Sequence, residues 1–215
     1  MTNKQKFLIS VILLFTFYFL LIIYRYWYAD TLYAKAKNLN RSEDPIPAGK
    51  LLSKAISISP NEPYFHLELS ESYTKLGKVD PAISEMQKAT TLSPSNVNLK
   101  RAEFSMFIRL SLIDTKYLKN AIVSLEEAIQ MAPTDAKLLY NLGLSYERVG
   151  ESKKAIEIMQ NAIEMKPNYK EARLALAFLL IDKNEKEKAK EELNYILTKI
   201  DPNDTLTQKT LKEIE

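Results

Sequence analysis

The stretch LLYNLGLSYERVG, Leu138 to Gly150, decides the fold. Its apolar residues recur at helical spacing, but Gly143 lies in the middle, where glycine costs about 1 kcal/mol relative to alanine. The following stretch ESKKAIEIMQNAIEMKP indicates a second helix with Ala155 and Ala162 on its apolar face, and Gly150 suits the left-handed end of the first helix. This pattern predicts a helical hairpin in which Gly143 faces Ala155 and Ala162 and lets the two backbones approach closely. Taken alone, the stretch leaves open that Gly143 is a tolerated surface glycine.

The same pattern recurs along the chain. Prolines occur at intervals of 34, 39, 34 and 35 residues, at Pro60, Pro94, Pro133, Pro167 and Pro202. The residue after each proline is a predicted helix N-cap: Asn61, Ser95, Thr134, Asn168 and Asn203. Alanines seven apart precede the first four prolines, as Ala48/Ala55, Ala82/Ala89, Ala121/Ala128 and Ala155/Ala162, and the last unit has Ala189/Ile196 at these positions. Ser70 and Ala177 occupy the position equivalent to Gly143 in two other units. We therefore expect this repeat position to require a small side chain.

A period of 34 residues with these positions resembles the tetratricopeptide repeat. The resemblance implies an α-solenoid of about five helical hairpins. With an apolar N-terminal run and a terminal capping helix, we expect an all-α chain that has one transmembrane helix. We expect a membrane anchor over residues 1–28, repeats over 29–204 and a cap over 205–215 that packs through Leu206, Leu211 and Ile214. The expected units are 29–62, 63–96, 97–135, 136–169 and 170–204.

The third unit is irregular. It carries about five additional residues, which we expect near IDTKYLKN. Its first helix has no clear register, and we assign Phe104, Ser105 and Ile108 to the positions of Leu142, Gly143 and Tyr146.

The N-terminus predicts a membrane anchor. FLISVILLFTFYFLLIIY, residues 7–24, has 18 residues without charge and spans about 27 Å as a helix, close to the hydrocarbon thickness of a bilayer. An aromatic belt follows, with Tyr24, Tyr26, Trp27 and Tyr28. A cleaved signal peptide is the alternative, but the apolar run is long for one and no small-residue cleavage site follows it.

Because no proline or glycine occurs before Asp44, the membrane helix should continue into the first repeat. Lys4 and Lys6 favour a cytoplasmic N-terminus with extracytoplasmic repeats, whereas Arg25 argues for the reverse.

The composition offers little for catalysis. The chain has no cysteine and one histidine, His66, which we expect to be structural, so we predict neither a metal site nor a cofactor. Its four glycines form no phosphate-binding loop, and its carboxylates follow the exposed faces of predicted helices. The net charge of +3 comes largely from Lys4 and Lys6, so we expect no nucleic-acid partner. We therefore expect no enzyme activity.

The resemblance implies a concave groove, lined by the first helix of each hairpin, that binds a peptide or protein partner. The expected groove residues are Tyr64, Leu67, Glu68, Glu71, Lys137, Tyr140, Asn141, Leu144, Arg148, Glu171, Leu174, Ala175, Phe178 and Asp182. Tyr140, Asn141 and Arg148 suit an extended peptide or an acidic terminus. A hydrophilic groove with no particular ligand remains the alternative.

A narrower resemblance concerns the stretches YRYWYADTLYAKAKNLNR and KAISISPNEPYFHLELSESY. Together with residues 113–143, they are similar to the C-terminal repeat tails of O-antigen-ligase-like bacterial membrane proteins. This resemblance implies an accessory module of cell-envelope glycan assembly, not catalytic alone, with a glycan-assembly membrane protein as partner. Two hypotheses therefore stand: a membrane-anchored scaffold for a protein partner, and such an accessory module.

Overall fold

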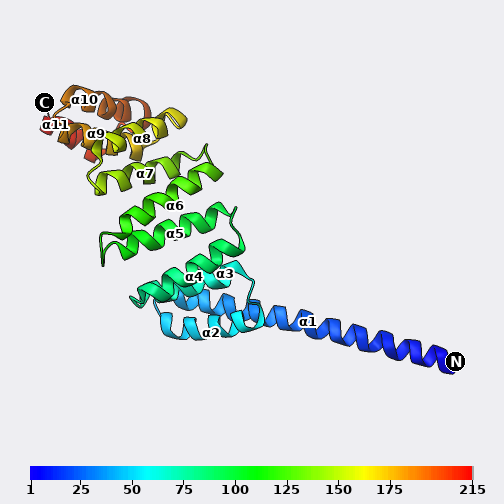
Figure 1. Ribbon diagram of the computed structural model, residues 1–215. Coiled ribbons are helices and arrows are strands. Elements are labelled where there is room, and N and C mark those ends of the chain that lie inside the picture. The colour runs from blue at the N-terminus through cyan, green and yellow to red at the C-terminus, as the bar shows by residue number, and fades with distance from the viewer. Residues whose placement is uncertain (215) are drawn as a thin grey trace. The chain divides into compact units, whose positions relative to one another are not determined.

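The computed structural model describes residues 1–214, and helices are the only regular secondary structure in that range (Figure 1). The α-helices are α1 (Asn3–Arg41), α2 (Pro45–Ile58), α3 (Pro63–Lys75), α4 (Val79–Leu92), α5 (Val97–Leu110), α6 (Tyr117–Met131), α7 (Ala136–Arg148), α8 (Ser152–Met165), α9 (Lys170–Asp182), α10 (Lys186–Tyr195) and α11 (Thr205–Ile214). A π-helical turn, η1 (Ile196–Ile200), continues α10. The all-α fold predicted from the sequence is confirmed.

Consecutive helices pair as antiparallel hairpins, from α1 with α2 to α9 with α10. The chain forms two compact units. The first comprises residues 1–94, with α1 to α4, and the second begins at Ser95 and contains α5 to α11.

Three residues join the two helices of a regular hairpin. Gly77 and Gly150 have φ of +66° and +80°, and the following amides close each helix, as in Glu151 N–H donating to Tyr146 O at 2.9 Å. Asn184 and Glu43 adopt the same left-handed conformation in their hairpins. The third hairpin differs: six residues, Ser111–Lys116, join α5 to α6, and each of its helices is one residue longer than its counterpart in the α7–α8 hairpin. These differences account for the five additional residues.

The prolines lie inside tight turns rather than directly before helix caps. Asp135 N–H donates to Ala132 O at 3.2 Å, and Tyr169 N–H donates to Lys166 O at 2.9 Å, so each proline and its successor are the central residues of a β-turn. The helix therefore begins one residue later than predicted. The N-caps are Glu62, Asn96, Asp135 and Tyr169, and α11 follows Asp204. The N-cap assignments at Asn61, Ser95, Thr134, Asn168 and Asn203 were wrong.

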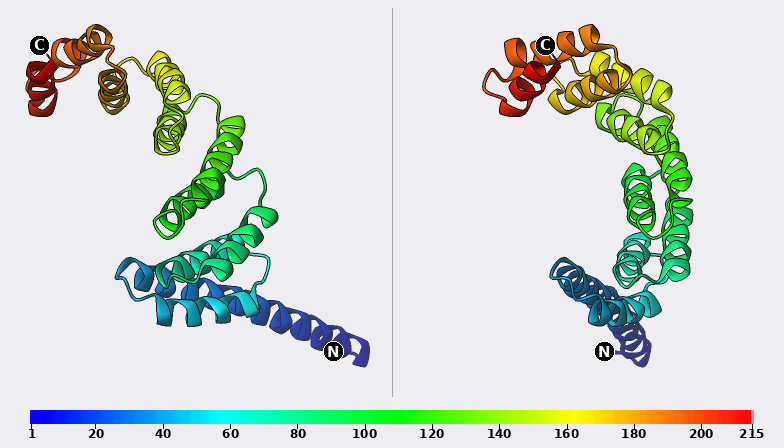
Figure 2. Two further views of the ribbon diagram at one scale, coloured as in Figure 1. Left: turned by 60° about the vertical axis from the view of Figure 1, so that its left-hand side comes forward. Right: turned by 90° about the vertical axis from the view of Figure 1, so that its left-hand side faces the viewer.

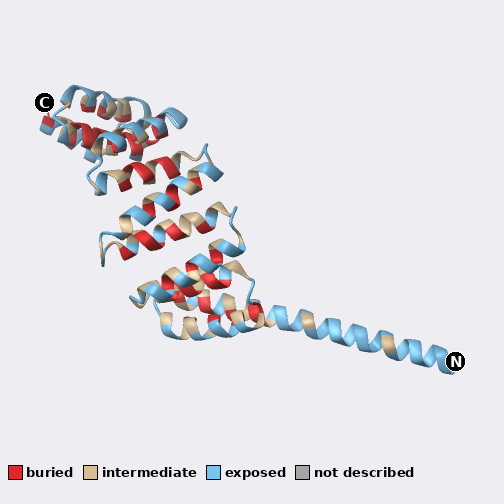
Figure 3. Cartoon of the chain, in the orientation of Figure 1, coloured by how far each residue is buried: buried red, intermediate tan, exposed pale blue. Residues whose placement is uncertain are grey.

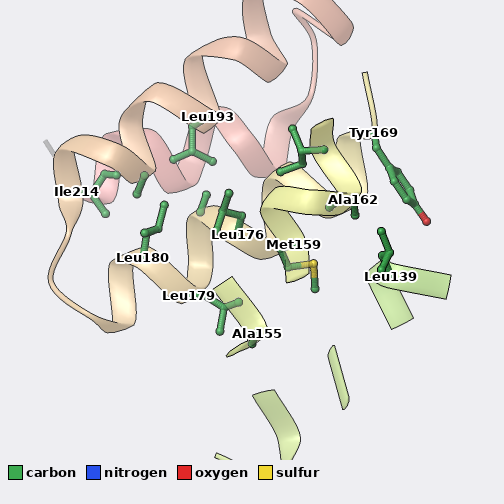
Figure 4. Close-up of a cluster of buried hydrophobic side chains, with 14 residues drawn as sticks. Leu139, Ala155, Met159, Ala162, Tyr169, Leu176, Leu179, Leu180, Leu193 and Ile214 are labelled. Atoms are coloured by element: carbon green, nitrogen blue, oxygen red, sulfur yellow. The ribbon is translucent and has the colours of Figure 1, made fainter. Parts of the chain in front are cut away.

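The alanines spaced seven apart form the centre of each hairpin. All of them are fully buried, together with the larger residues between them: Leu52, Met86, Leu125, Met159 and Leu193 (Figure 3). Figure 4 shows a buried cluster of the second unit, where Met159 lies between Ala155 and Ala162. Small residues at the ends of each pair let the helices approach, and the large central residue fills the space between them.

Gly143 lies at a close approach, as predicted, but its neighbour is different. A Cβ atom on Gly143 would lie 2.9 Å from Met159 Cε and 3.1 Å from Met159 Cγ. The residue opposite Gly143 is thus Met159 rather than Ala155 or Ala162. Ser70 and Ala177 are fully buried at the same position, and Ser70 Oγ donates to Ala82 O at 2.7 Å.

The register expected in the irregular repeat was wrong. Ser105, assigned to the small buried position, is exposed. Phe104 instead packs against the Leu125 cluster, and Phe107 is buried, which places the register one residue earlier. A one-residue error rotates a helical position by about 100°, enough to exchange a buried face for an exposed one.

His66 is structural, as predicted. Its Nε2 lies 2.8 Å from Pro60 O and its Nδ1 lies 2.6 Å from Glu85 Oε2. Arg173 occupies the same position in the last hairpin. Its Nε donates to Pro167 O at 2.7 Å, and its guanidinium pairs with Glu192. In both hairpins one cationic or ionisable side chain bonds the first helix to the preceding turn and to the second helix.

The terminal helix α11 covers the last hairpin through Leu211 and Ile214, as predicted, but not through Leu206. Thr207, Thr210 and Ile214 are buried, and Leu211 packs against the core cluster. Leu206 is 49% exposed, so its assignment to the packed face was wrong.

The first helix runs unbroken for 39 residues, as predicted from the absence of proline and glycine (Figure 2). Ala29, Leu32, Ala36 and Asn40 are buried in the first unit. The apolar N-terminal part projects beyond the other helices with its side chains exposed (Figure 3), and by length and composition it can cross a membrane.

Candidate partner-binding surface

The expected groove residues of the first unit lie on α3. Tyr64 is 39% exposed, whereas Leu67 and Glu71 are half-buried. The carboxylate of Glu68 accepts a hydrogen bond from Asn40 Nδ2 at 2.8 Å, and Glu71 lies 3.9 Å from Lys75 Nζ. These two carboxylates are therefore already engaged within the unit.

The expected residues of α7 form a stripe along that helix. Lys137 and Arg148 are exposed near its two ends, about 16 Å apart along the axis. Tyr140, Asn141 and Leu144 lie half-buried between them. The stripe thus has cations near both ends and an aromatic, amide and aliphatic centre.

The expected residues of α9 lie close to this stripe. Leu174 and Ala175 pack, half-buried, on the same core cluster as Tyr140 and Leu144. Phe178 is 43% exposed, and Glu171 and Asp182 are exposed. The structure therefore brings the α7 and α9 residues onto one cluster within the second unit, while the α3 residues belong to the first unit.

An aromatic pair joins the two helices. The ring centroids of Tyr140 and Tyr169 are 5.3 Å apart at an interplanar angle of 47°, a tilted arrangement that favours the pair. Tyr169 is buried and borders the cluster (Figure 4). Burial raises the pKa of Tyr169 to about 12, with a contribution from the Glu171 carboxylate, and burial also raises the pKa of Tyr140. Both phenols therefore remain protonated hydrogen-bond donors at neutral pH.

A hollow of ≈ 630 Å³ opens beside Tyr169, within the size range of ligand pockets. Its lining comes from the turns before α7 and α9: Ala132, Thr134, Asp135, Ala136, Lys137, Met165, Lys166 and Tyr169. Lys166 Nζ lies 4.6 Å from the Tyr169 ring centroid. Asp135 forms an ion pair with Arg101, so its negative charge is offset. Lys137 and Lys166 therefore give the lining of the hollow a net positive charge. Such a hollow can accept a carboxylate.

Lys166 and Tyr169 were missed by the sequence analysis. One signal for Tyr169 was available, because it is an aromatic N-cap where other hairpins have Glu62, Asn96 and Asp135. The proximity of Tyr169 to Tyr140, by contrast, depends on how two hairpins stack.

The helical hairpins, repeated at a period close to 34 residues, define the chain as an α-helical repeat protein. The tetratricopeptide repeat family matches residues 64–96, 124–157 and 148–209. The chain is a tetratricopeptide repeat protein.

Comparison with individual proteins agrees with this fold. The chain is 25% identical over 170 residues to the BBSome complex member BBS4 of Bos taurus, covering 66% of this chain and 33% of that protein, so it spans about a third of the curated relative. MamA (residues 41 to the end) from Desulfovibrio magneticus RS-1 superposes with a TM-score of 0.66 at 22% identity over 82% of this chain and 97% of that one. YrrB, described as a tetratricopeptide repeat protein with an unusual peptide-binding site, gives a TM-score of 0.62 at 18% identity over 84% of this chain and 90% of that one.

Proposed function

We propose that this protein is a membrane-anchored scaffold that binds an extended segment of a partner protein on the surface formed by α7, α9 and the turns before them. The observation that carries the proposal is the Tyr140–Tyr169 pair beside a hollow that holds Lys137 and Lys166. The fold itself supports a role in protein interaction, and we propose that the chain acts by binding rather than by catalysis.

The surface suggests the chemistry of the bound segment. An apolar or aromatic side chain of the partner would pack on Tyr140, Leu174 and Phe178, which expose apolar surface. An acidic side chain or a C-terminal carboxylate would lie between Lys137 and Lys166. Asn141 would hydrogen-bond the backbone of the segment, since its amide both donates and accepts. The peptide-binding site named for YrrB supports a peptide ligand for this fold.

The anchor is α1. Its exposed apolar side chains from Phe7 to Tyr24 have no covering partner in residues 1–214, and a bilayer would remove them from water. Trp27 and Tyr26 are also exposed and suit the membrane interface. Because the short N-terminal tail carries Lys4 and Lys6, we propose a cytoplasmic N-terminus and extracytoplasmic repeats.

The alternative is an accessory module of an O-antigen-ligase-like assembly, with the same anchor and a glycan-assembly membrane protein as partner. It rests on the juxtamembrane and repeat sequences alone. Co-purification of a polytopic membrane protein with the full chain, independent of Lys137 and Lys166, would favour it over the proposed scaffold.

The test is capture of partners from detergent-solubilised membranes by the full chain and by two variants. Lys137→Glu/Lys166→Glu reverses the charge of the hollow, and Tyr140→Ala/Arg148→Ala removes the central aromatic residue and a terminal cation. Both variants should reduce capture at least about ten-fold, the loss expected for ~1.4 kcal/mol of binding free energy.

Lys153→Glu/Lys186→Glu is the matched control, because it makes the same charge change at exposed positions on the second helices of two hairpins. Circular dichroism should be unchanged in all three proteins. Equal capture by the control and the test variants would place the binding site elsewhere.

A further inference from the structure

Two neighbouring pockets lie where α1 leaves the first unit. The first, ≈ 330 Å³, is lined by Tyr26, Asp30, Ser59, Pro60, Asn61 and Glu62. The second, ≈ 210 Å³, is lined by Tyr18, Ile22, Arg25, Tyr26 and Ile58. Tyr26 lines both, so the two pockets follow one another along the helix.

The charges in these pockets are separated. The first contains two carboxylates, Asp30 and Glu62, and the second contains the guanidinium of Arg25. None of the three forms an ion pair with any other residue within 1–214. A ligand with a negative group followed by a positive group would satisfy all three.

Ser59 gives an independent sign of a ligand. This residue is only 7% exposed and lines the first pocket, and its hydroxyl oxygen has no hydrogen-bond partner among residues 1–214. A buried hydroxyl without a partner is destabilising, because it has lost its bonds to water. A bound donor in the pocket would restore such a bond.

The position of the pockets indicates where the ligand comes from. If the hydrocarbon core ends near Tyr24, Arg25 lies about 1.5 Å and Asp30 about 9 Å beyond it along the helix axis. The headgroup layer on each side of a bilayer is roughly 5–8 Å thick, so Arg25 lies within it and Asp30 lies at its outer edge. Tyr18 and Ile22 of the second pocket lie within the proposed span, at the depth of the acyl chains. The second pocket, nearer the span, has the side chains of Ile22 and Ile58 in its wall and suits the glycerol end of a lipid.

From this order we infer that the junction of α1 and the α2–α3 turn is a binding site for one phospholipid with a primary ammonium headgroup. The phosphate pairs with Arg25, and the ammonium lies between Asp30 and Glu62 over the ring of Tyr26. Ser59 accepts a hydrogen bond from the ammonium. A trimethylammonium headgroup has no N–H to donate, and a glycerol headgroup has no positive charge, so both should bind less well.

This inference rests on the proposed membrane anchor. Trp27 is the only tryptophan of the chain and follows Tyr26 in sequence, so a brominated lipid at this junction can quench it, in addition to the quenching by the surrounding bilayer that the control variants measure. The full chain is reconstituted in bilayers of phosphatidylcholine, phosphatidylethanolamine and phosphatidylglycerol, with bromine near the glycerol of one lipid at a time. Bromine quenches tryptophan on contact, so quenching of Trp27 reports which lipid is bound.

Phosphatidylethanolamine should occupy the site about five-fold more than phosphatidylcholine or phosphatidylglycerol, a factor that corresponds to ~1 kcal/mol. Asp30→Asn/Glu62→Gln should abolish this preference. Arg25→Gln should weaken association with all three lipids. The matched control is Asp80→Asn/Glu147→Gln, which removes the same charge at exposed positions and should keep the preference.

Equal quenching of the wild-type protein by all three lipids would overturn the site while leaving the anchor intact. A preference for phosphatidylethanolamine that persists in the Asp30→Asn/Glu62→Gln variant would also overturn the site. Absence of quenching by any brominated lipid would overturn the anchor and the site together, so the two failures are distinguishable.

Discussion

At the scale of single residues, Gly143 and Met159 share one space between α7 and α8. Met159 is fully buried, and its side chain occupies the position that a Cβ on residue 143 would need. Ser70 and Ala177 meet the same requirement with a hydroxymethyl and a methyl group. Glycine destabilises the helix relative to alanine, and the van der Waals contact with Met159, the central residue of the facing helix, offsets that loss of stability.

Gly143→Leu should destabilise the protein by about 1–3 kcal/mol, although leucine favours the helix more than glycine does. The physical reason is overlap of the new side chain with Met159. Chemical denaturation followed by circular dichroism measures the change in unfolding free energy.

The double variant Gly143→Leu/Met159→Ala is the control, because it removes the side chain that the leucine meets. It should be more stable than the sum of the two single changes predicts. Additive effects, or stabilisation by Gly143→Leu alone, would contradict the packing account.

A second prediction concerns Asp204, which precedes α11. Its carboxylate accepts hydrogen bonds from the Thr207 hydroxyl and from Thr207 N–H at 3.1 Å, and it lies 3.3 Å from Lys170 Nζ. The hydroxyl of Thr207 is the largest cause that holds the pKa of Asp204 below its ordinary 3.8. Asp204→Ala should cost about 1 kcal/mol at pH 7, as expected for loss of an N-cap.

The pH dependence has a defined sign. Since the pKa of Asp204 is lower in the folded protein, its stabilisation is present above pH 3.8 and is lost as the pH falls through the folded value. The stability difference between the wild type and Asp204→Ala should therefore shrink below pH 3.8. A difference that stays constant between pH 7 and the acid range would exclude this role for the carboxylate.

At the scale of helices, the ends of each element follow from turn chemistry more than from helix propensity. Left-handed residues close the first helix of a hairpin at Gly77, Gly150, Glu43 and Asn184. Prolines inside β-turns separate one hairpin from the next. Because every regular hairpin uses the same two turns, the period remains close to 34 residues.

The terminal helix α11 provides the element-scale prediction. Ile214 is 6% exposed and belongs to the core cluster, whereas Leu206 on the same helix faces solvent. Ile214→Ala should lower the unfolding free energy by about 2 kcal/mol, and Leu206→Ala should have little effect. Thermal unfolding of the full chain in detergent measures both.

Removal of the residues after Asn203 should have a larger effect, because it uncovers the apolar face of the last hairpin. We expect a lower melting temperature or aggregation. An unchanged melt for the truncated chain would show that α11 is not a cap.

At the scale of the whole molecule, one continuous helix links the proposed anchor to the first repeat. The buried residues Ala29, Leu32 and Ala36 fix the C-terminal part of α1 in the first unit, and the helix continues from there to Asn3. Without an interrupting loop, the proposed span and the first hairpin share one rigid element. With the proposed span in a bilayer, this geometry holds the first unit at the membrane surface, as the proposed lipid site requires.

Protease treatment tests the proposed orientation. With the outer wall permeabilised and the inner membrane intact, the repeats should be digested, since we expect them outside the cytoplasm. A cytoplasmic protein in the same cells should remain intact and so control for lysis. Repeats that survive until the inner membrane is broken would reverse the orientation.

The sequence by itself determined the features that depend on spacing along one chain. The period of prolines and alanines predicts the hairpins, because helix pairing at this length is local and each side chain faces a neighbour a fixed number of residues away. The unbroken α1 follows equally from the absence of proline and glycine before Asp44. The structural role of His66 followed from its position in the repeat.

Only the tertiary structure decided the features that depend on rotation and stacking. The register of α5 turns on a rotation of one residue, which a hydrophobic pattern with gaps does not resolve. The exposure of Leu206 on α11 and the contact between Gly143 and Met159 likewise depend on how the facing helices pack. The Tyr140–Tyr169 pair, the hollow beside Lys166 and the pockets around Tyr26 join segments from different hairpins or elements. Their proximity arises from how helices pack against one another, and that packing is set by the volumes of many buried side chains together rather than by any single stretch.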